Sequence, residues 1–301
     1  MSEQLVAKIQ RLKRERNAVI LAHNYQLPEV QDVADYVGDS FELSRKAAAT
    51  DAEVIVFCGV HFMAESAFIL APHKTVLLPE RLAGCPLAET ITEDDLRRKK
   101  REYPEATVVC YVNSSAAVKA ESDICCTSSN AVQVVNSLPS KQVLFVPDAN
   151  LAHWVAGQTD KEIIPWRGHC VTHHRVTEED VRRAREAVPG AVIAVHPECR
   201  PEVAARADFV GSTSALLRFA RETDHREIVV GTEMGILHRM KKENPHKKFY
   251  LLSPGLICPN MKMTTLDKVA RALERLEPRI TVPEGTRLRA AAALEKMLAV
   301  T

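Results

Sequence analysis

The chain has 301 residues and eight cysteines, but no two of them are separated by two residues. Zinc ribbons, thioredoxin-like redox sites and compact ferredoxin sites need such Cys-x-x-Cys pairs, so these classes are excluded. The sequence also lacks an apolar stretch of the about 20 residues that cross a bilayer. Its amphipathic start, MSEQLVAKIQRLKRER, has no signal-peptide core. We therefore expect a cytoplasmic protein without a membrane segment, whose thiols stay reduced.

The sequence also lacks an excess of charge of either sign. It has 40 basic and 39 acidic residues, a net charge of +1. The basic run 97–101 falls on a predicted helix, where such a run is usually a solvated face. No basic DNA-reading helix is recognisable, so we expect no nucleic-acid partner.

Three of the cysteines close segments that look like copies of one another. Cys85, Cys170 and Cys258 end the segments TVLLPERLAGC, EIIPWRGHC and FYLLSPGLIC, at intervals of 85 (85 to 170) and 88 (170 to 258) residues. Each segment begins with an apolar run, which predicts a buried strand. Each thiol is therefore expected just beyond the carboxyl end of a strand.

Other parts of the copies align in the same register. First strands are predicted over 17–25, 106–115 and 191–199, and third strands over 52–59, 142–150 and 227–235. Two sets of polar residues occupy equivalent positions at the ends of the first strands. One set is His23, Tyr111 and His196, and the other is Tyr25, Asn113 and Glu198. The second strand-to-helix junctions, GDSFEL, TSSNAV and GSTSAL, align Ser40, Ser128 and Ser212. Threonine and aspartate three residues apart predict capping boxes at Thr92/Asp95, Thr177/Asp180 and Thr264/Asp267.

The alternation of strands and helices predicts an α/β protein with parallel sheets. We expect three homologous three-layer αβα domains, over 17–102, 103–188 and 189–262, in a triangular pseudo-threefold arrangement. Segments 1–16 and 263–301 are expected to form terminal helices that pack on the first repeat. Ligands bind at the carboxyl ends of parallel strands. With those ends turned inward, the aligned polar residues would face one cavity.

The three aligned cysteines suit a metal centre at the junction of the repeats. Structural zinc usually takes four protein ligands in close pairs, which this chain lacks. A 4Fe-4S cluster on three cysteines leaves one iron free to act as a Lewis acid, and we favour it over the alternative that the cysteines only fill the core. Cys58 and Cys110 are expected to be core residues, whereas Cys125, Cys126 and Cys199 stay ambiguous.

Several segments resemble the quinolinate synthase family, in family order. They are AHNYQLPEVQDVADYVGDS, CYVNSSAAVKAESDICCTSSNA, PDANLAHWV, WRGHC, HPEC, GSTSAL, GTEMG and CPNMKM. The resemblance implies three homologous domains around one 4Fe-4S cluster, with Cys85, Cys170 and Cys258 as its ligands. It implies condensation of iminoaspartate with dihydroxyacetone phosphate to quinolinate, with loss of phosphate and two waters, in de novo NAD biosynthesis. An aspartate oxidase or dehydrogenase is the implied supplier of iminoaspartate.

The resemblance also implies roles for individual residues. Glu198 matches the general base and Tyr25 a proton donor or acceptor near the open iron. His23 and His196 match site histidines, for which we expect titration near neutral pH and proton shuttling. The positions matching substrate-binding residues are Ser40, Tyr111, Asn113, Ser128, Ser212 and Thr213. The alternatives are plain helix caps for the serines and a structural role for the histidines.

Other functions fit the same architecture. Hydroxymethylbutenyl diphosphate reductase and the archaeal-type diphthamide enzyme also arrange three related domains around a cluster on three cysteines. The segments HNY, YVNSS and HPEC favour quinolinate synthase over both. A non-catalytic iron-sulfur sensor is a further alternative, although sensors usually carry a DNA-reading or partner-binding element.

Overall fold

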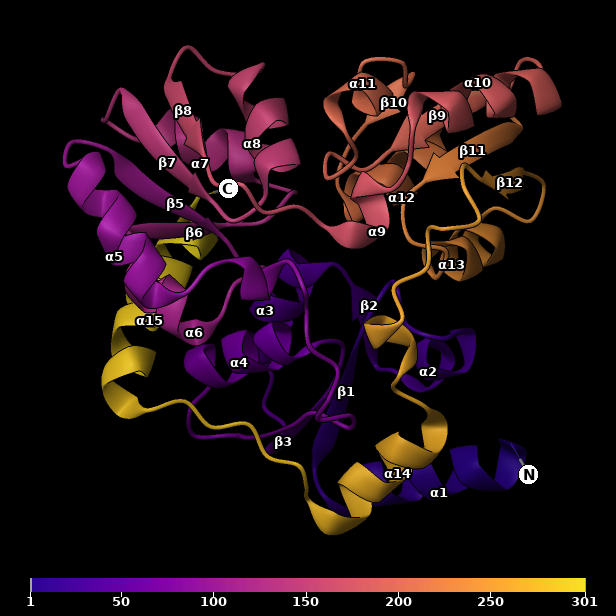
Figure 1. Cartoon of the computed structure of the whole chain (residues 1–301). Helices are drawn as coiled ribbons and strands as arrows, with labels where there is room; N and C mark the ends of the chain where they lie inside the picture. The colour runs from indigo at the N-terminus through magenta and orange to yellow at the C-terminus, as the bar shows by residue number, and fades with distance from the viewer. Residues whose placement is uncertain (1, 301) are drawn as a thin grey trace.

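The computed structural model describes residues 2–300 and contains three four-stranded parallel sheets with the same strand order. Numbered along the chain within each unit, the strands lie across the sheet in the order second, first, third, fourth. Figure 1 shows the three sheets, each with its own helices, around a common centre. The predicted α/β class with three αβα domains is confirmed. We call the parts built on these sheets the first, second and third units.

The bounds of the elements follow the repeat. The first unit contains β1 (Ala18–His23), α2 (Pro28–Val33), β2 (Tyr36–Gly38), α3 (Ser40–Ala49), β3 (Val54–Cys58), α4 (His61–Leu70), β4 (Thr75–Leu77) and the 3₁₀ turn η1 (Ala88–Thr90). The second contains α5 (Glu93–Glu102), β5 (Thr107–Tyr111), α6 (Ala116–Ala120), β6 (Ile124–Cys126), α7 (Ala131–Ser137), β7 (Gln142–Val146), α8 (Ala149–Ala156), β8 (Glu162–Pro165) and α9 (Val171–His174). The third contains α10 (Glu178–Ala187), β9 (Val192–Val195), α11 (Pro201–Ala204), β10 (Phe209–Val210), α12 (Thr213–Glu222), β11 (Glu227–Gly231), α13 (Ile236–Glu243), β12 (Lys248–Leu251) and the 3₁₀ turn η2 (Asn260–Lys262). The terminal helices are α1 (Ser2–Glu15), α14 (Leu266–Arg275) and α15 (Glu284–Ala299).

One polar contact recurs in all three units, beside the first strand. An aspartate carboxylate just before the second strand accepts a backbone N–H of the first strand. The pairs are Asp35 with Ile20 (2.8 Å), Asp123 with Val108 (2.8 Å) and Asp208 with Ile193 (2.7 Å). The contact satisfies a strand N–H that would otherwise lose its partner on leaving water. The repeat therefore extends to individual hydrogen bonds.

Two of the three predicted capping boxes are present. Thr92 and Thr177 cap α5 and α10, each with the reciprocal aspartate bond. The third prediction is wrong, because α14 begins after Thr265, whose side chain makes no capping bond. Thr264 is fully buried and its hydroxyl has no hydrogen-bond partner among the described residues. Thr264 thus lies one residue before the N-cap position, and its side chain is buried in the core.

The helices at the ends of the chain pack on different units. α1 and α14 contact each other and the first sheet, and they share an apolar core that includes Ile9, Leu12, Val269 and Leu273. α15 lies against α6 and β6 of the second unit and also contacts α4 of the first (Figure 1). The expectation that all of 263–301 packs on the first repeat therefore needs correction for α15. Its buried stripe is rich in alanine, which lets the helix approach both units closely.

Two further helices, each just before a predicted boundary, pack against elements beyond it. α5 contacts α6, and α10 contacts α11. Each of these helices therefore packs on the unit that follows it in the chain, whereas the predicted boundaries at 102 and 188 assign it to the preceding unit.

Within residues 2–300, no helix combines the length and the apolar character that a membrane crossing needs.

Candidate functional site

The three units enclose one cavity at the carboxyl ends of their strands. About 770 Å³ of this space, including the part open to solvent, is free of protein atoms. Every predicted site residue lines it except Ser212. Ser212 instead caps α12, where its hydroxyl accepts the N–H of Ala215 at 3.3 Å. The structure thus brings together residues that are up to 235 positions apart in the chain (His23 to Cys258).

The three aligned cysteines all line this cavity, one from each unit. Cys85, Cys170 and Cys258 each lie just before a helical turn, namely η1, α9 and η2. Backbone N–H groups of these turns point at the sulfurs. Burial raises the pKa of the Cys85 thiol to about 12, and the N–H groups of Leu87 and Ala88 partly oppose that rise. The thiols are therefore protonated in the free protein and would lose their protons to a bound metal.

The other five cysteines lie outside the cavity lining. All five are buried and are Cys58, Cys110, Cys125, Cys126 and Cys199. Cys110 and Cys125 are neighbours in the register of β5 and β6. The three ambiguous cysteines, Cys125, Cys126 and Cys199, are thus part of the core like Cys58 and Cys110.

The spacing of the donor atoms bears on which metal group could fit. Among residues 2–300, one group of three His, Cys, Asp or Glu side chains has all its ligand atoms within 4.8 Å of one another, and it is Cys170, His173 and Glu198. The three cysteine sulfurs do not meet that limit. A single ion could not bind all three without movement, whereas a multi-metal group can span a wider gap. Three thiols from three units, beside the group of Cys170, His173 and Glu198, are therefore suited to hold a metal cofactor at this cavity.

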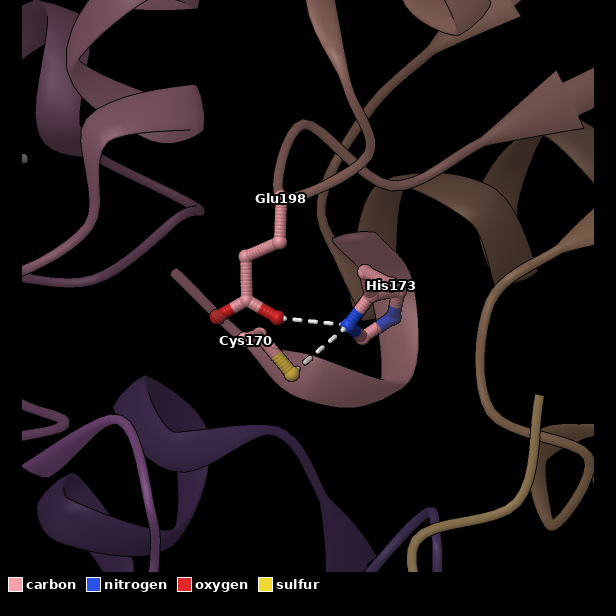
Figure 2. A group of neighbouring side chains, drawn as sticks. All are labelled: Cys170, His173 and Glu198. Carbon is pink, nitrogen blue, oxygen red and sulfur yellow. Dashed lines mark hydrogen bonds and ion pairs between the residues drawn. The ribbon is translucent and has the colours of Figure 1, made fainter. Parts of the chain in front are cut away.

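Glu198 lies at the centre of the hydrogen-bond network in the cavity. The Tyr111 hydroxyl donates to Glu198 Oε1 at 2.7 Å, and His173 Nδ1 lies 2.7 Å from Oε2 (Figure 2). Asn150 Nδ2 donates to the Glu198 carbonyl oxygen at 2.8 Å, which holds its loop. Burial alone would raise the pKa of Glu198, but His173, His196 and Tyr111 together lower it to about 2. Glu198 is therefore ionised at neutral pH and serves as an acceptor.

His173 is a site residue that the sequence analysis missed. It is 1% exposed, and its Nδ1 also lies 3.2 Å from the Cys170 sulfur. Figure 2 shows one ring nitrogen of His173 in contact with both Cys170 and Glu198. The repeat gave no signal for it, because the positions aligned with it hold Ala88 and Met261. The available signal was its place three residues after a predicted ligand, one helical turn along.

A second missed residue, Thr232, joins His173 to Tyr25. Its hydroxyl lies 2.8 Å from His173 Nε2 and 2.5 Å from the Tyr25 hydroxyl. Burial raises the pKa of Tyr25 well above its usual value, so the phenol is protonated and donates. Because Glu198 is ionised, the proton on His173 belongs on Nδ1 and Nε2 accepts. The order of donors is then Tyr25 to Thr232 to His173 to Glu198.

The pKa values of the two predicted site histidines are lower than the sequence suggested. Burial lowers the pKa of His23 to about 4 and that of His196 to about 3. The expectation of titration near neutral pH is therefore wrong, since neither ring can be hydrated when it is charged. His196 Nε2 lies 3.1 Å from the Ser128 hydroxyl, and His23 Nδ1 accepts the N–H of Tyr25 at 3.1 Å.

The remaining predicted residues offer polar groups to the cavity. Asn113 Nδ2 lies 3.4 Å from Glu198 Oε1, and its buried Oδ1 has no hydrogen-bond partner in the described chain. Thr213 contacts the Tyr25 hydroxyl at 3.2 Å. Ser40 lines the cavity at the first residue of α3, where Asp39 is the cap. An orphaned buried carbonyl such as that of Asn113 indicates a missing donor.

Comparison with known proteins agrees with this geometry. A family model described as quinolinate synthetase A protein matches residues 7–299. The chain is 59% identical over 297 residues to a quinolinate synthase of Clostridium kluyveri, with 98% of both chains covered. It is 58% identical to one of Alkaliphilus metalliredigens, with 98% of each chain covered, and 55% identical to one of Methanosarcina barkeri, with 99% of this chain and 98% of the relative covered. The chain belongs to the quinolinate synthetase A family.

Proposed function

We propose that this protein is a cytoplasmic enzyme of NAD biosynthesis that condenses iminoaspartate with dihydroxyacetone phosphate to quinolinate, releasing phosphate and two waters. The observation that carries the proposal is one cavity lined by the three thiols together with Tyr25, His173 and Glu198. Thr232, buried behind this lining, joins Tyr25 to His173. The names of the relatives supply the product. An aspartate oxidase or dehydrogenase would supply the unstable imine.

The cavity offers donors for an anionic substrate. Iminoaspartate carries two carboxylates, which hydroxyl and amide groups can bind. The proposed binding groups are those of Ser40, Tyr111, Asn113, Ser128 and Thr213, all in the cavity lining. Ser212 lies outside the cavity lining and caps α12. Its part in substrate binding would therefore be indirect, through the position of that helix start.

The buried chain would move a proton away from Tyr25. The Tyr25 proton can pass to the Thr232 hydroxyl, whose own proton passes to His173 Nε2. The imidazolium that results is stabilised by Glu198, ionised and 2.7 Å from Nδ1. Tyr25 then acts as the base that takes a substrate proton, and Glu198 acts through His173. His23 and His196, neutral at pH 7, can accept hydrogen bonds or protons from the reacting groups.

Cys85, Cys170 and Cys258 would hold a 4Fe-4S cluster, whose free iron would supply a Lewis acid for loss of hydroxide. The reaction has no net electron transfer, so no external reductant is needed. The protein's part is to exclude water, orient the substrate carboxylates and place Tyr25 beside the reacting carbons.

The test is the reaction itself. The protein is reconstituted with iron and sulfide without oxygen, supplied with dihydroxyacetone phosphate and freshly generated iminoaspartate, and assayed for quinolinate by chromatography. Iron and sulfide analysis establishes the cluster in the same sample. Quinolinate formation that depends on both substrates is expected. A chain that holds the full cluster and forms no quinolinate would refute the proposal.

A further inference from the structure

Two buried carboxylates contact the cysteine loops but have no part in the proposed reaction. Asp148 lies two residues after β7 and is fully buried. Its Oδ2 accepts the backbone N–H of Cys170 at 3.1 Å, and its Oδ1 accepts the N–H of Leu151 at 2.7 Å. One carboxylate thus ties the Cys170 loop to the first turn of α8.

Glu233 makes the same kind of contact in the third unit. It lies two residues after β11 and is fully buried. Its Oε1 accepts the backbone N–H of Cys258 at 3.1 Å, and its Oε2 accepts the N–H of Gly235 at 2.8 Å. Lys262 pairs with the same oxygen at 2.9 Å and also donates to the backbone oxygen of Tyr25. This network therefore joins the Cys258 loop to the segment that carries the proposed base.

The first unit holds its cysteine loop differently. The position two residues after β3 is Val60, which has no acceptor in its side chain. The segment before Cys85 is held through its backbone oxygens. Ala83 accepts the N–H of His61 at 2.8 Å, and Gly84 accepts Asn260 Nδ2 at 2.8 Å. Two of the three loops are thus fixed by carboxylates and one is not.

We propose that Asp148 and Glu233 are positioning residues that hold the loops of Cys170 and Cys258 in place before any metal group binds. Each joins its own loop to the helical turn that follows the third strand, because one of its oxygens accepts an N–H from the loop and the other an N–H from that turn. The importance of these two cysteines rests on the proposed function. The positioning itself can be measured in the cluster-free protein and does not depend on activity.

The experiment measures how fast each cysteine is alkylated. The full, reduced, cluster-free chain is exposed to a limited amount of iodoacetamide, and mass spectrometry gives a rate for each cysteine. The three thiols are partly exposed in the cavity lining, so a faster reaction means that the loop moves more freely to admit the reagent. A backbone hydrogen bond to a buried carboxyl group opposes that movement. Asp148→Ala should raise the rate at Cys170 roughly ten- to a hundredfold, and Glu233→Ala should do the same at Cys258. Neither should change the rate at Cys85.

Amide variants and a core cysteine provide the controls. Asp148→Asn and Glu233→Gln keep one oxygen acceptor for the cysteine N–H but place an amide NH2 against the second N–H donor, so their alkylation rates should lie between those of the alanine variants and the unsubstituted chain. Cys58, fully buried in β3, reports global unfolding. Unchanged rates in the alanine variants, an equal rise at all three cysteines, or no rescue by the amides would overturn the proposal.

Two further results keep the inference separate from the proposed function. If an alanine variant does not fold, hydrogen exchange in the unsubstituted chain replaces it, where slow exchange of the Cys170 and Cys258 amides is expected and free exchange would overturn the proposal. Loop-specific alkylation in a chain that makes no quinolinate would defeat the proposed function alone. Quinolinate synthesis with unaltered alkylation would defeat this inference alone.

Discussion

Replacing Thr232 by valine tests the proposed proton path at the residue that joins Tyr25 to His173. Valine has nearly the shape of threonine but no hydroxyl, so the change breaks the link between Tyr25 and His173. Thr232 is fully buried, so water cannot take the place of the lost group. It is not part of the cavity lining, so the substrate-binding groups stay as they are.

The size of the effect follows from the contacts. His173 Nε2 loses its partner at 2.8 Å, while the Tyr25 hydroxyl keeps Thr213 at 3.2 Å. Leaving one buried polar atom unpaired costs about 1–3 kcal/mol of folding stability. Loss of positioned proton transfer lowers kcat by roughly a hundredfold to ten-thousandfold. KM should change little, because the contact lies behind Tyr25 and does not face the substrate.

The assay compares kcat and KM for quinolinate formation in Thr232→Val and Thr232→Ser, each with its cluster content measured. Serine keeps the hydroxyl and should retain most of the activity. Tyr25→Phe combined with Thr232→Val should be no worse than Tyr25→Phe alone, because both changes break one path. A valine variant that turns over within twofold of the unsubstituted enzyme, at equal cluster content, would show that the proton does not travel this way.

Three further predictions concern the cluster, Glu198 and the dependence on pH. Serine in place of any of the three aligned cysteines should abolish the broad visible absorption of the cluster, whereas Cys58→Ser should not. A full spectrum in one of the three would remove that residue from the ligand set. Glu198→Gln should keep the cluster and lower kcat roughly a hundredfold or more, and unaltered turnover would place the acceptor elsewhere. The free energy of unfolding should fall from pH 7 to pH 5 by about 2 kcal/mol for each of His23 and His196. The pKa values in the folded protein, about 4 and 3, lie below the usual 6.5, so the unfolded chain binds the extra protons in this window. Urea titrations that give one unfolding free energy at both pH values would contradict the burial argument.

The sequence by itself was enough to predict the fold, because the patterns that mark strands and helices are local and occur in three copies. Apolar runs mark the strands, and their repetition in one register predicts equal units. The three aligned cysteines stood out for the same reason. The structure adds that the hydrogen bond of the aspartate before each second strand follows the same register.

Only the tertiary structure could decide what has no counterpart in the repeat. His173 and Thr232 align with apolar, glycine or proline residues in the other units, so their roles exist only where the second unit meets the third. Pattern could not show the neutral state of the two histidines, because a pKa depends on how completely the ring is shielded from water. The place of α15 was hidden for a related reason, since a helix with an apolar stripe fits whichever unit leaves a groove open. Local sequence sets which elements form, and the packing of distant segments sets which side chains meet.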